Sequence, residues 1–222
     1  MRIGLLGTGM VGLALADRLA ELGHEVRMGA RDPDNETAHR WATQAGANAS
    51  CGDFADAASF GELVINATAG ASSIRALEQA TAAALAGKVL LDVANPLNQE
   101  AGETTLTVVN DDSLGEQIQR AFPKARVVKA LNTMNCQVMV HPELVPGEHV
   151  VFVCGEDTGA KDAIVKLLGG FGWPSHRIID LGGIAAARGT EAFLLLWLPT
   201  WSALGGLPFN VALPRTSRAE SA

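Results

Sequence analysis

The sequence predicts an α/β fold with a doubly wound, mostly parallel sheet, followed by a C-terminal helical segment. Two observations predict it. Short apolar runs typical of buried strands alternate with helical patterns up to about residue 182, and no repeat, low-complexity run or long linker interrupts this alternation. A parallel sheet requires this rhythm, because each strand must return through a connection that is usually a helix.

The first residues carry the most informative pattern, which is a strand, a glycine turn and a helix. Arg2–Leu6 is a short apolar run, and apolar residues recur at helical spacing from Val11 to Leu22. In a GxGxxG turn the first glycine allows the bend, the second leaves room for a pyrophosphate, and the third lets the helix lie close to the strand. Free amides at the helix start then bind the phosphates. We therefore expect a Rossmann-like dinucleotide cradle rather than a turn that binds nothing. Its residues are Gly7, Thr8, Gly9, Met10, Val11 and Gly12.

The end of the second predicted strand, residues 25–28, selects between two dinucleotides. An NAD site usually offers an acidic side chain there, whereas an NADP site lacks the carboxylate and supplies a cation for the 2′-phosphate. By the usual geometry of this unit the decisive position is Ala30, and Arg31 follows it. An arginine can bind a phosphate with two hydrogen bonds, and the Thr8 hydroxyl can add another. The pattern favours NADP over NAD.

Other interpretations of this strand end stay open. If the strand were two residues longer, Asp32 would become the ribose ligand and the preference would move toward NAD. Arg40 is a candidate to share or replace the role of Arg31, and Arg31 as a plain surface arginine is the third alternative.

The remaining elements follow in chain order, and local signals support two of the helices. Gly87 ends the helix before the fifth strand. Ser113 and Glu116 have the spacing of a capping box, which opens a helix after a polar loop at 95–110. We expect strands at residues 47–51, 63–67, 88–93, 127–130, 150–154 and 177–180. We expect helices at residues 36–46, 53–60, 73–86 and 158–168, besides the one that Ser113 opens.

Small and amide-bearing residues follow three of the predicted strands. In a doubly wound sheet the ligand lies over the carboxyl ends of the strands, so these loops should line its site. Small side chains let a flat ring approach the backbone, and Asn95 and Asn132 can pair with a carboxamide or a heterocycle edge. As alternatives, Asn95 before Pro96 is only a turn residue and Asn132 only a loop-stabilising amide. The candidate contacts are Thr68, Ala69, Gly70, Ala94, Asn95 and Asn132.

Composition argues against several classes of protein. The chain of 222 residues has a net charge of -7 and a pI near 5.2, which argues against a general nucleic-acid surface. The three cysteines and five histidines show no metal-ligand spacing, so we expect no metal and reduced, mostly buried thiols. Met1 leads directly into the first strand, which leaves no room for a signal peptide, and we expect a cytoplasmic protein.

An uncharged stretch at residues 192–213 is long enough to be a membrane span. Breaks such as Pro199 and Gly205 argue against a span, and an all-apolar helix at 193–198 is more simply buried in a core or in a subunit contact. We expect a homodimer and no membrane. The expected division is a nucleotide-binding domain at 1–182, a helical segment at 183–215 that lines a second site or a dimer contact, and a flexible tail at 216–222.

The sequence offers no obvious proton donor for a dehydrogenase reaction. Without any tyrosine, it cannot be an ordinary short-chain dehydrogenase. Arg188 and Glu191, three residues apart, are expected to form a helical ion pair. What remains is a hydride carrier with no obvious acid, which suits transfer between a nicotinamide and a second redox ring, a flavin or a deazaflavin. Trp197 and Trp201 would wall the pocket of that ring.

Two rival functions remain. The first is reduction of a small carbonyl or imine, with Lys129 as the candidate polar group, although a lysine at a strand end is usually structural. The second is a non-catalytic NADP sensor.

The chain resembles the NADP oxidoreductase family that includes coenzyme F420-dependent NADP reductase, and is similar to the cytosolic reductase domain of the STEAP metalloreductases. The resemblance covers nearly the whole chain and implies an NADP-binding fold, a C-terminal segment near the second-ring site, and dimers. It also implies that Thr8 and Arg31 hold the 2′-phosphate and that Asn132 stands beside the hydride path. Asn132 and Ala30 depart from the histidine and the serine typical of the deazaflavin reductases. The matching segments are GLLGTGMVG, HEVRMGARD, DVANP, VVKALNTM, VFVCGEDTGAKDAIVKLL and DLGGIAAARGTEAF.

Overall fold

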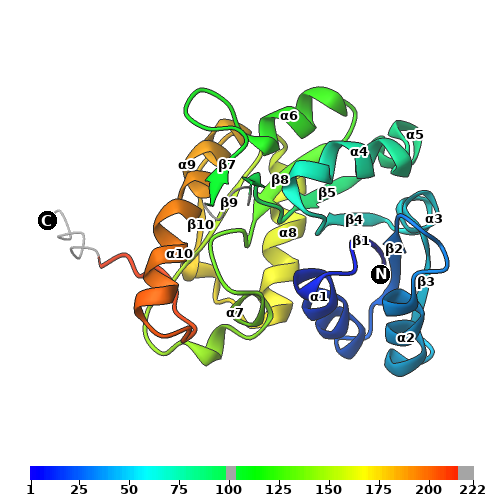
Figure 1. The fold of residues 1–222 in the computed structure, drawn as a ribbon, viewed down its shortest axis with the longest axis horizontal. Coiled ribbons are helices and arrows are strands. Elements are labelled where there is room, and N and C mark those ends of the chain that lie inside the picture. Colours follow the sequence, from blue (N-terminus) through cyan, green and yellow to red (C-terminus); the bar gives the residue numbers. More distant parts are fainter. Residues whose placement is uncertain (99–103, 215–222) are drawn as a thin grey trace, which may run out of the picture.

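The computed structural model describes residues 1–98 and 104–214, and its main feature is an eight-stranded sheet covered by helices on both faces (Figure 1). The strand order is β10-β9-β8-β5-β4-β1-β2-β3, with a separate pair of short strands, β6 and β7. The order reverses beside β1, which is the usual ligand position in such a sheet. The predicted Rossmann-like, mostly parallel α/β fold is confirmed.

The elements have these bounds. The first six strands of the large sheet are β1 (Arg2–Leu6), β2 (Glu25–Ala30), β3 (Ala49–Asp53), β4 (Leu63–Asn66), β5 (Val89–Asp92) and β8 (Arg126–Ala130). The helices that connect them are α1 (Met10–Glu21), α2 (Glu36–Ala45), α3 (Phe54–Phe60), α4 (Gly70–Ala80), α5 (Ala82–Leu85) and α6 (Leu114–Ala121). The small pair is β6 (Leu97–Asn98) and β7 (Thr105–Leu106). After β8 come α7 (Cys136–Val140), β9 (Val151–Cys154), α8 (Thr158–Phe171), β10 (Ile178–Asp180), α9 (Ala187–Ala192) and α10 (Leu194–Ala203).

Apolar side chains on the two faces of the sheet form two cores, as the continuous apolar strands require. Ile3 and Leu5 of β1 belong to the core under α1, α2, α7 and α8, whereas Leu6 belongs to the core under α3, α4 and α6. Gly4 lets α3 pack directly on β1, because a Cβ at Gly4 would stand 2.1 Å from the Ala57 carbonyl oxygen. The central strand is thereby fixed from both sides.

The last two strands differ from the expected direction. β9 runs antiparallel to β8, and β10 runs parallel to β9. The connection from β8 to β9 carries only the five-residue α7 and a short 3-10 turn at Pro142–Leu144. Without a full crossover helix the chain cannot return to the opposite edge, so it re-enters the sheet antiparallel.

Several element boundaries also differ from prediction. β2 runs two residues further, to Ala30. The helix expected at 73–86 begins at Gly70 and is divided at Thr81, whose φ of 69° breaks it and whose hydroxyl accepts from the Ala84 amide to start α5. The polar loop at 95–110 contains the β6/β7 pair. Pro199, expected to end a helix, lies inside α10.

The C-terminal segment is joined to α6 through long-range contacts. Glu191 accepts hydrogen bonds from the Leu114 and Gly115 amides at 2.8 and 3.0 Å, so its carboxylate caps α6. Arg188 pairs with Glu116 of α6 at 2.6 Å. The predicted Arg188–Glu191 ion pair is therefore wrong. The proposed division at residue 182 stays a prediction, and the tail expected at 216–222 lies outside the described residues.

A membrane span was considered for the apolar stretch at 192–213. In the part of the chain that the structure describes, none of the helices combines the length and the apolar character that crossing a bilayer requires.

Candidate functional site

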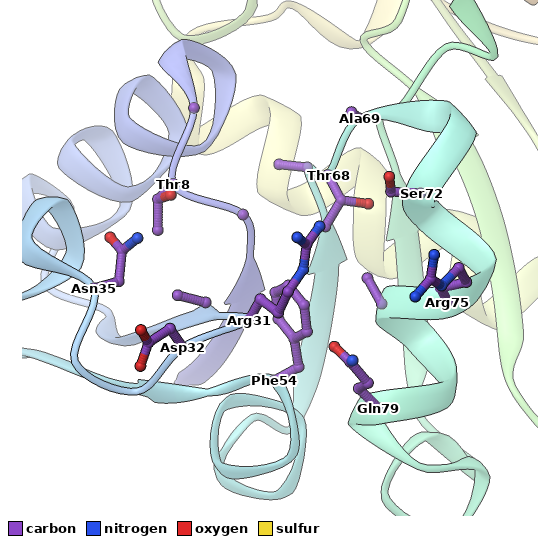
Figure 2. A pocket seen from close by; sticks show the side chains of 15 residues that line it. Thr8, Arg31, Asp32, Asn35, Phe54, Thr68, Ala69, Ser72, Arg75 and Gln79 are labelled. Atoms are coloured by element: carbon purple, nitrogen blue, oxygen red, sulfur yellow. The ribbon is translucent and has the colours of Figure 1, made fainter.

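A cavity of 530 Å³ lies over the carboxyl ends of β1, β2 and β4 (Figure 2). Phe54 lies at one end of it, one wall is the glycine turn with the end of β2, and the facing wall is α4. We call it the first cavity. Its lining is Gly7, Thr8, Gly9, Ala30, Arg31, Asp32, Asn35, Phe54, Ala67, Thr68, Ala69, Ser72, Arg75, Ala76 and Gln79.

The three glycines of the turn differ in what surrounds them. A Cβ at Gly12 would stand 2.2 Å from the Gly7 carbonyl oxygen, and one at Gly7, whose φ is 119°, would stand 2.5 Å from the Ala67 carbonyl oxygen. Both positions therefore require glycine to build the turn. A Cβ at Gly9 would meet no protein atom within 4 Å. Because α1 begins at Met10, the amides of its first turn point to the same open space. The turn thus has the free amides and the open space that an anion site requires.

Both residues that the sequence offers as selectors of the cofactor, Arg31 and Asp32, lie at the end of the first cavity beside β2. β2 ends at Ala30, so the condition under which Asp32 would become the ribose ligand is met, and Arg31 and Asp32 both line the cavity. The Asp32 carboxylate accepts from the Asp34 amide at 3.0 Å and so closes the turn before α2. Figure 2 shows Arg31 reaching across the cavity toward Thr68, with Thr8 and Asp32 on the opposite side. Arg40 is not among the described lining residues.

Helix α4 adds polar side chains that sequence reasoning missed. Ser72, Arg75 and Gln79 are spaced by three and four residues, so one face of α4 presents all three to the first cavity. The signal was present in the sequence, but the helix was predicted to start at residue 73 and its face was not matched to the ligand. Within the described residues, neither Arg31 nor Arg75 has an ion-pair partner. Two unpaired cations therefore face this cavity.

A second cavity of 470 Å³ adjoins the first and shares with it Ala67, Thr68 and Ala69. Among the described residues that line it, none is an aspartate, glutamate, lysine, arginine or histidine. Its surface is mainly apolar, with amides and one thiol. Its lining is Met10, Val11, Ala67, Thr68, Ala69, Gly70, Val93, Ala94, Asn95, Leu97, Asn132, Met134, Asn135, Cys136, Met139, Leu194, Trp197 and Leu198.

The predicted cofactor contacts fall almost entirely in these two cavities. The first cavity is lined by Gly7, Thr8, Gly9 and Arg31, and the second by Met10, Val11, Gly70, Ala94, Asn95 and Asn132. Both cavities are lined by Thr68 and Ala69. Gly12 lies beneath the turn instead of at its surface.

The two predicted amides are bonded to each other. Asn95 donates from Nδ2 to the Asn132 carbonyl at 2.8 Å, and Asn132 donates from Nδ2 to Asn95 Oδ1 at 2.9 Å. Leu131 has a φ of 66°, a left-handed conformation that is costly for this side chain and that turns the chain immediately before Asn132. The loop-stabilising role weighed for Asn132 is thus realised, while both residues still line the second cavity.

Lys129 is not placed to react with a substrate. Its side chain is 0% exposed and is not among the described residues that line either cavity. Burial alone would lower the pKa of Lys129, but the Asp92 and Glu191 carboxylates outweigh it and raise that pKa. The structure does not support Lys129 as the polar group of a carbonyl or imine reductase, because its ammonium is buried and paired and does not line either cavity.

Aromatic residues close the second cavity at its C-terminal side. Trp197 lines the cavity and is stacked on Trp201 and Phe209, with ring centroids 6.0 and 5.5 Å away. Trp201 is more exposed and is not among the described lining residues, so it supports Trp197 from outside the cavity. The expectation that both tryptophans wall the pocket holds in the geometry only for Trp197.

The three thiols are free and lie in different surroundings. Cys136 is partly exposed and lines the second cavity, whereas Cys51 is partly exposed on β3, beside His39. Burial raises the pKa of Cys154 to about 12. Within the described ranges of the chain, no group of three or more histidine, cysteine, aspartate or glutamate side chains is placed to hold a metal ion.

Comparison with known proteins identifies relatives of the whole chain. Residues 2–96 match the family model described as NADP oxidoreductase coenzyme F420-dependent. The crystal structure of a protein from Arthrobacter sp. FB24, provisionally described as an F420-dependent NADP reductase, is 49% identical, covers 97% of this chain and 100% of its own, and superposes with a TM-score of 0.92.

More distant relatives share parts of this similarity. The metalloreductase STEAP3 of Rattus norvegicus is 30% identical over 203 residues, which are 90% of this chain, and the chain spans 38% of the length of the rat protein. The imine reductase BcSIRED from Bacillus cereus, 15% identical with a TM-score of 0.63 over 91% of this chain and 62% of its own, shares the fold. From the Arthrobacter relative and the family match, this chain belongs to the coenzyme F420-dependent family of NADP oxidoreductases.

Proposed function

We propose that the protein transfers a hydride between NADPH in the first cavity and a second redox ring, a deazaflavin or a flavin, in the second cavity. The observation that carries this proposal is the pair of adjoining cavities. The first combines free amides at the start of α1 with two arginines that have no ion-pair partner, and the second is mainly apolar, with the Cys136 thiol as the one titratable side chain among the described residues that line it. Ala67, Thr68 and Ala69 border both, so a dinucleotide can extend from one cavity into the other.

The residues of the first cavity fit the phosphates and the adenosine of NADPH. The open space at Gly9 and the free amides of α1 would hold the pyrophosphate. Thr8 and Arg31 would hold the 2′-phosphate, and Arg75 on the facing wall would add a second cation. The nicotinamide would then stand between the loops after β4 and β5 and the turn at Asn132. When bound, it supplies the hydride.

The lining of the second cavity favours a ring over a small carbonyl as hydride partner. Reduction of a carbonyl or an imine needs a positioned proton donor, and Lys129 is buried away from this cavity. Hydride transfer between two stacked rings depends mainly on alignment. The small residues Gly70 and Ala94 and the aromatic ring of Trp197 line this cavity and would allow a flat ring to stack there.

Stopped-flow absorbance of NADPH separates this proposal from its rivals. Oxidation of NADPH by a deazaflavin or a flavin supports ring-to-ring transfer. Oxidation only with carbonyls or imines would support the first rival, and binding without turnover would support the NADP sensor.

A second copy of the chain is the partner we propose, at the outer side of α10. Leu195 and Leu196 of α10 are exposed by 46 and 62% of their surfaces, and Leu207, which follows α10, is exposed by 66%. Because Leu194 and Trp197 of the same helix line the second cavity, a contact through α10 would place the dimer interface at the edge of that cavity. Light scattering of the purified protein should give twice the chain mass. A cytoplasmic location is proposed with it, since the three cysteines are free thiols.

Cys136 offers a chemical test of where the second ring binds. In a Cys51→Ser protein, iodoacetamide should label Cys136 alone, because Cys154 is buried and its pKa is about 12. A saturating flavin or deazaflavin should slow that labelling several-fold, since the ring would cover the thiol. Mass spectrometry of the labelled peptide measures the rate.

The matched control is 2′,5′-ADP, which contains only the adenosine end of the cofactor. It should leave the labelling rate unchanged, because the first cavity does not include Cys136. Unchanged labelling at a saturating concentration of a ring that is reduced by NADPH would place the ring elsewhere.

A further inference from the structure

Lys129 joins three separate parts of the chain at one buried point. Its Nζ atom lies 2.8 Å from Asp92 Oδ2, 2.6 Å from the Ala94 carbonyl oxygen and 2.7 Å from Glu191 Oε1. An ammonium has three N–H donors, and here each has one acceptor. The side chains of Lys129 and Asp92 are 0% exposed, and that of Glu191 is 2% exposed. The three residues come from the segments DVANP, VVKALNTM and GTEAF, which carried the family resemblance.

One side of this cluster fixes the floor of the second cavity. Ala94 lines the cavity, and its backbone is held at both ends, because its carbonyl accepts from Lys129 and its amide donates to Asp92 Oδ1 at 3.2 Å. The same Asp92 oxygen accepts from Asn66 Nδ2 at 2.8 Å, and Asn66 Oδ1 accepts from the Thr68 hydroxyl at 2.7 Å. Thr68 lines both cavities. The loops after β4 and β5 are therefore held by one hydrogen-bonded chain that ends at Lys129.

The other side of the cluster fixes the wall of the second cavity. Glu191 belongs to α9, and α10 starts three residues later at Leu194, which lines the cavity together with Trp197. The carboxylate also accepts from the Leu114 and Gly115 amides of α6. The three groups that contact the Glu191 carboxylate, which are the Lys129 ammonium and the two amides, are all donors. This carboxylate joins α9 to both β8 and α6, so it helps to set the position of α9 and with it the start of α10.

Stability alone does not explain a buried charge cluster here. Well-packed apolar residues of similar volume are often as stabilising as a buried ion pair or more so, because the charges must be desolvated. Directed hydrogen bonds, in contrast, fix distances between the groups they join. We propose that Lys129 and Glu191 are positioning residues, which set the spacing between the Ala94 floor and the α10 wall of the second cavity. The proposal rests on the proposed function insofar as that cavity holds the second ring.

Glu191→Gln tests this role, with Glu116→Gln as its matched control. A glutamine at position 191 would place its NH₂ group against an N–H donor, either the Lys129 ammonium or one of the two amides of α6. Because two donors repel each other, we expect α9 to shift. Glu116 also links α6 to α9, through Arg188, but does not contact Lys129. We expect Glu191→Gln to lower kcat/KM for the ring substrate about tenfold while the Kd for NADPH stays within about twofold. The Glu116→Gln protein should keep both kcat/KM and the Kd for NADPH within about twofold of wild type, although its melting temperature should fall because the ion pair with Arg188 is lost.

Two results would overturn the proposal. One is an unchanged kcat/KM for the ring substrate in Glu191→Gln. The other is an equal loss of NADPH affinity and of kcat/KM, which a general loss of structure would produce. If Glu191→Gln does not fold, Glu191→Asp gives the same comparison, because aspartate keeps the negative charge but its side chain is shorter by one methylene group.

The labelling rate of Cys136 gives a readout that needs no turnover. In the Cys51→Ser background, Glu191→Gln should change that rate, and Glu116→Gln should not, because only the first alters the cavity that Cys136 lines. An equal rate in both would contradict positioning. If the wild-type protein oxidises NADPH with neither flavin nor deazaflavin, the proposed function fails, and the labelling comparison still decides whether Lys129 and Glu191 set the cavity.

Discussion

A Gly9→Val protein is expected to fold normally and to lose detectable binding of both NADPH and NADH. The backbone at Gly9 is extended, with φ -78° and ψ -179°, a conformation that valine adopts readily. A Cβ there meets no protein atom within 4 Å, so the fold has no reason to change. The valine methyl groups would instead fill the space that the pyrophosphate needs. Calorimetric titration with each dinucleotide measures the loss, and thermal melting shows that the protein is folded.

Gly12→Ala is the informative contrast to Gly9→Val. Its Cβ would stand 2.2 Å from the Gly7 carbonyl oxygen, so α1 would have to move away from β1. This variant should lose stability as well as binding, whereas Gly9→Val should lose binding alone. Tight NADPH binding by a folded Gly9→Val protein would mean that the cofactor does not cross the glycine turn, and the proposed site would have to be abandoned.

The glycine turn could be predicted from the sequence because all its determinants are local. The strand, turn and helix between Arg2 and Glu21 are contiguous, and the spacing of the glycines states which one must be open. The direction of β9 could not be predicted in the same way. An apolar run such as Val151–Cys154 has the same pattern whether it pairs parallel or antiparallel, and the connection before it decides.

Residues of the candidate site that follow a strand end could be predicted from the sequence. Residues that reach the site through tertiary packing could not. The rule that ligands lie over strand ends found Thr68, Asn95 and Asn132. It could not find Cys136 or Leu194, because these reach the second cavity from α7 and α10, which pack over it. The partners of Glu191 were missed for the same reason. Sequence spacing suggested Arg188, but the nearest donors come from residues more than 60 positions away.

The remaining differences between the predicted and the observed site concern α4 and the end of β2. Arg75 lies inside the helix predicted at 73–86, but the sequence did not show which face of that helix meets the cavity, so a second cation for the phosphate was overlooked. Ending β2 at residue 28 instead of Ala30 left the choice between Arg31 and Asp32 open. With β2 ending at Ala30, both Arg31 and Asp32 line the first cavity. Their roles therefore depend on whether the bound dinucleotide carries the negatively charged 2′-phosphate.

Arg31→Ala is expected to weaken NADPH binding by about 2 to 3 kcal/mol and to spare NADH. Only NADPH carries the 2′-phosphate, whose two negative charges face Arg31 from within the first cavity in the proposed complex. The Arg75 cation on the opposite wall would remain, so binding should be reduced rather than abolished. Calorimetry with both dinucleotides gives the difference directly. Arg40→Ala should leave both affinities unchanged, because Arg40 is not among the described residues of this cavity.

Asp32→Asn determines whether the carboxylate or the guanidinium selects the cofactor. The asparagine oxygen can still accept from the Asp34 amide, so the turn before α2 is retained while the charge is removed. If Arg31 selects NADPH, Asp32→Asn should bind NADH as before and NADPH slightly more tightly, because a negative charge near the phosphate has been removed. If Asp32 holds the ribose hydroxyls, the same change should weaken NADH, and Arg31→Ala should affect both dinucleotides equally. The two variants therefore assign the preference even though both side chains share one cavity.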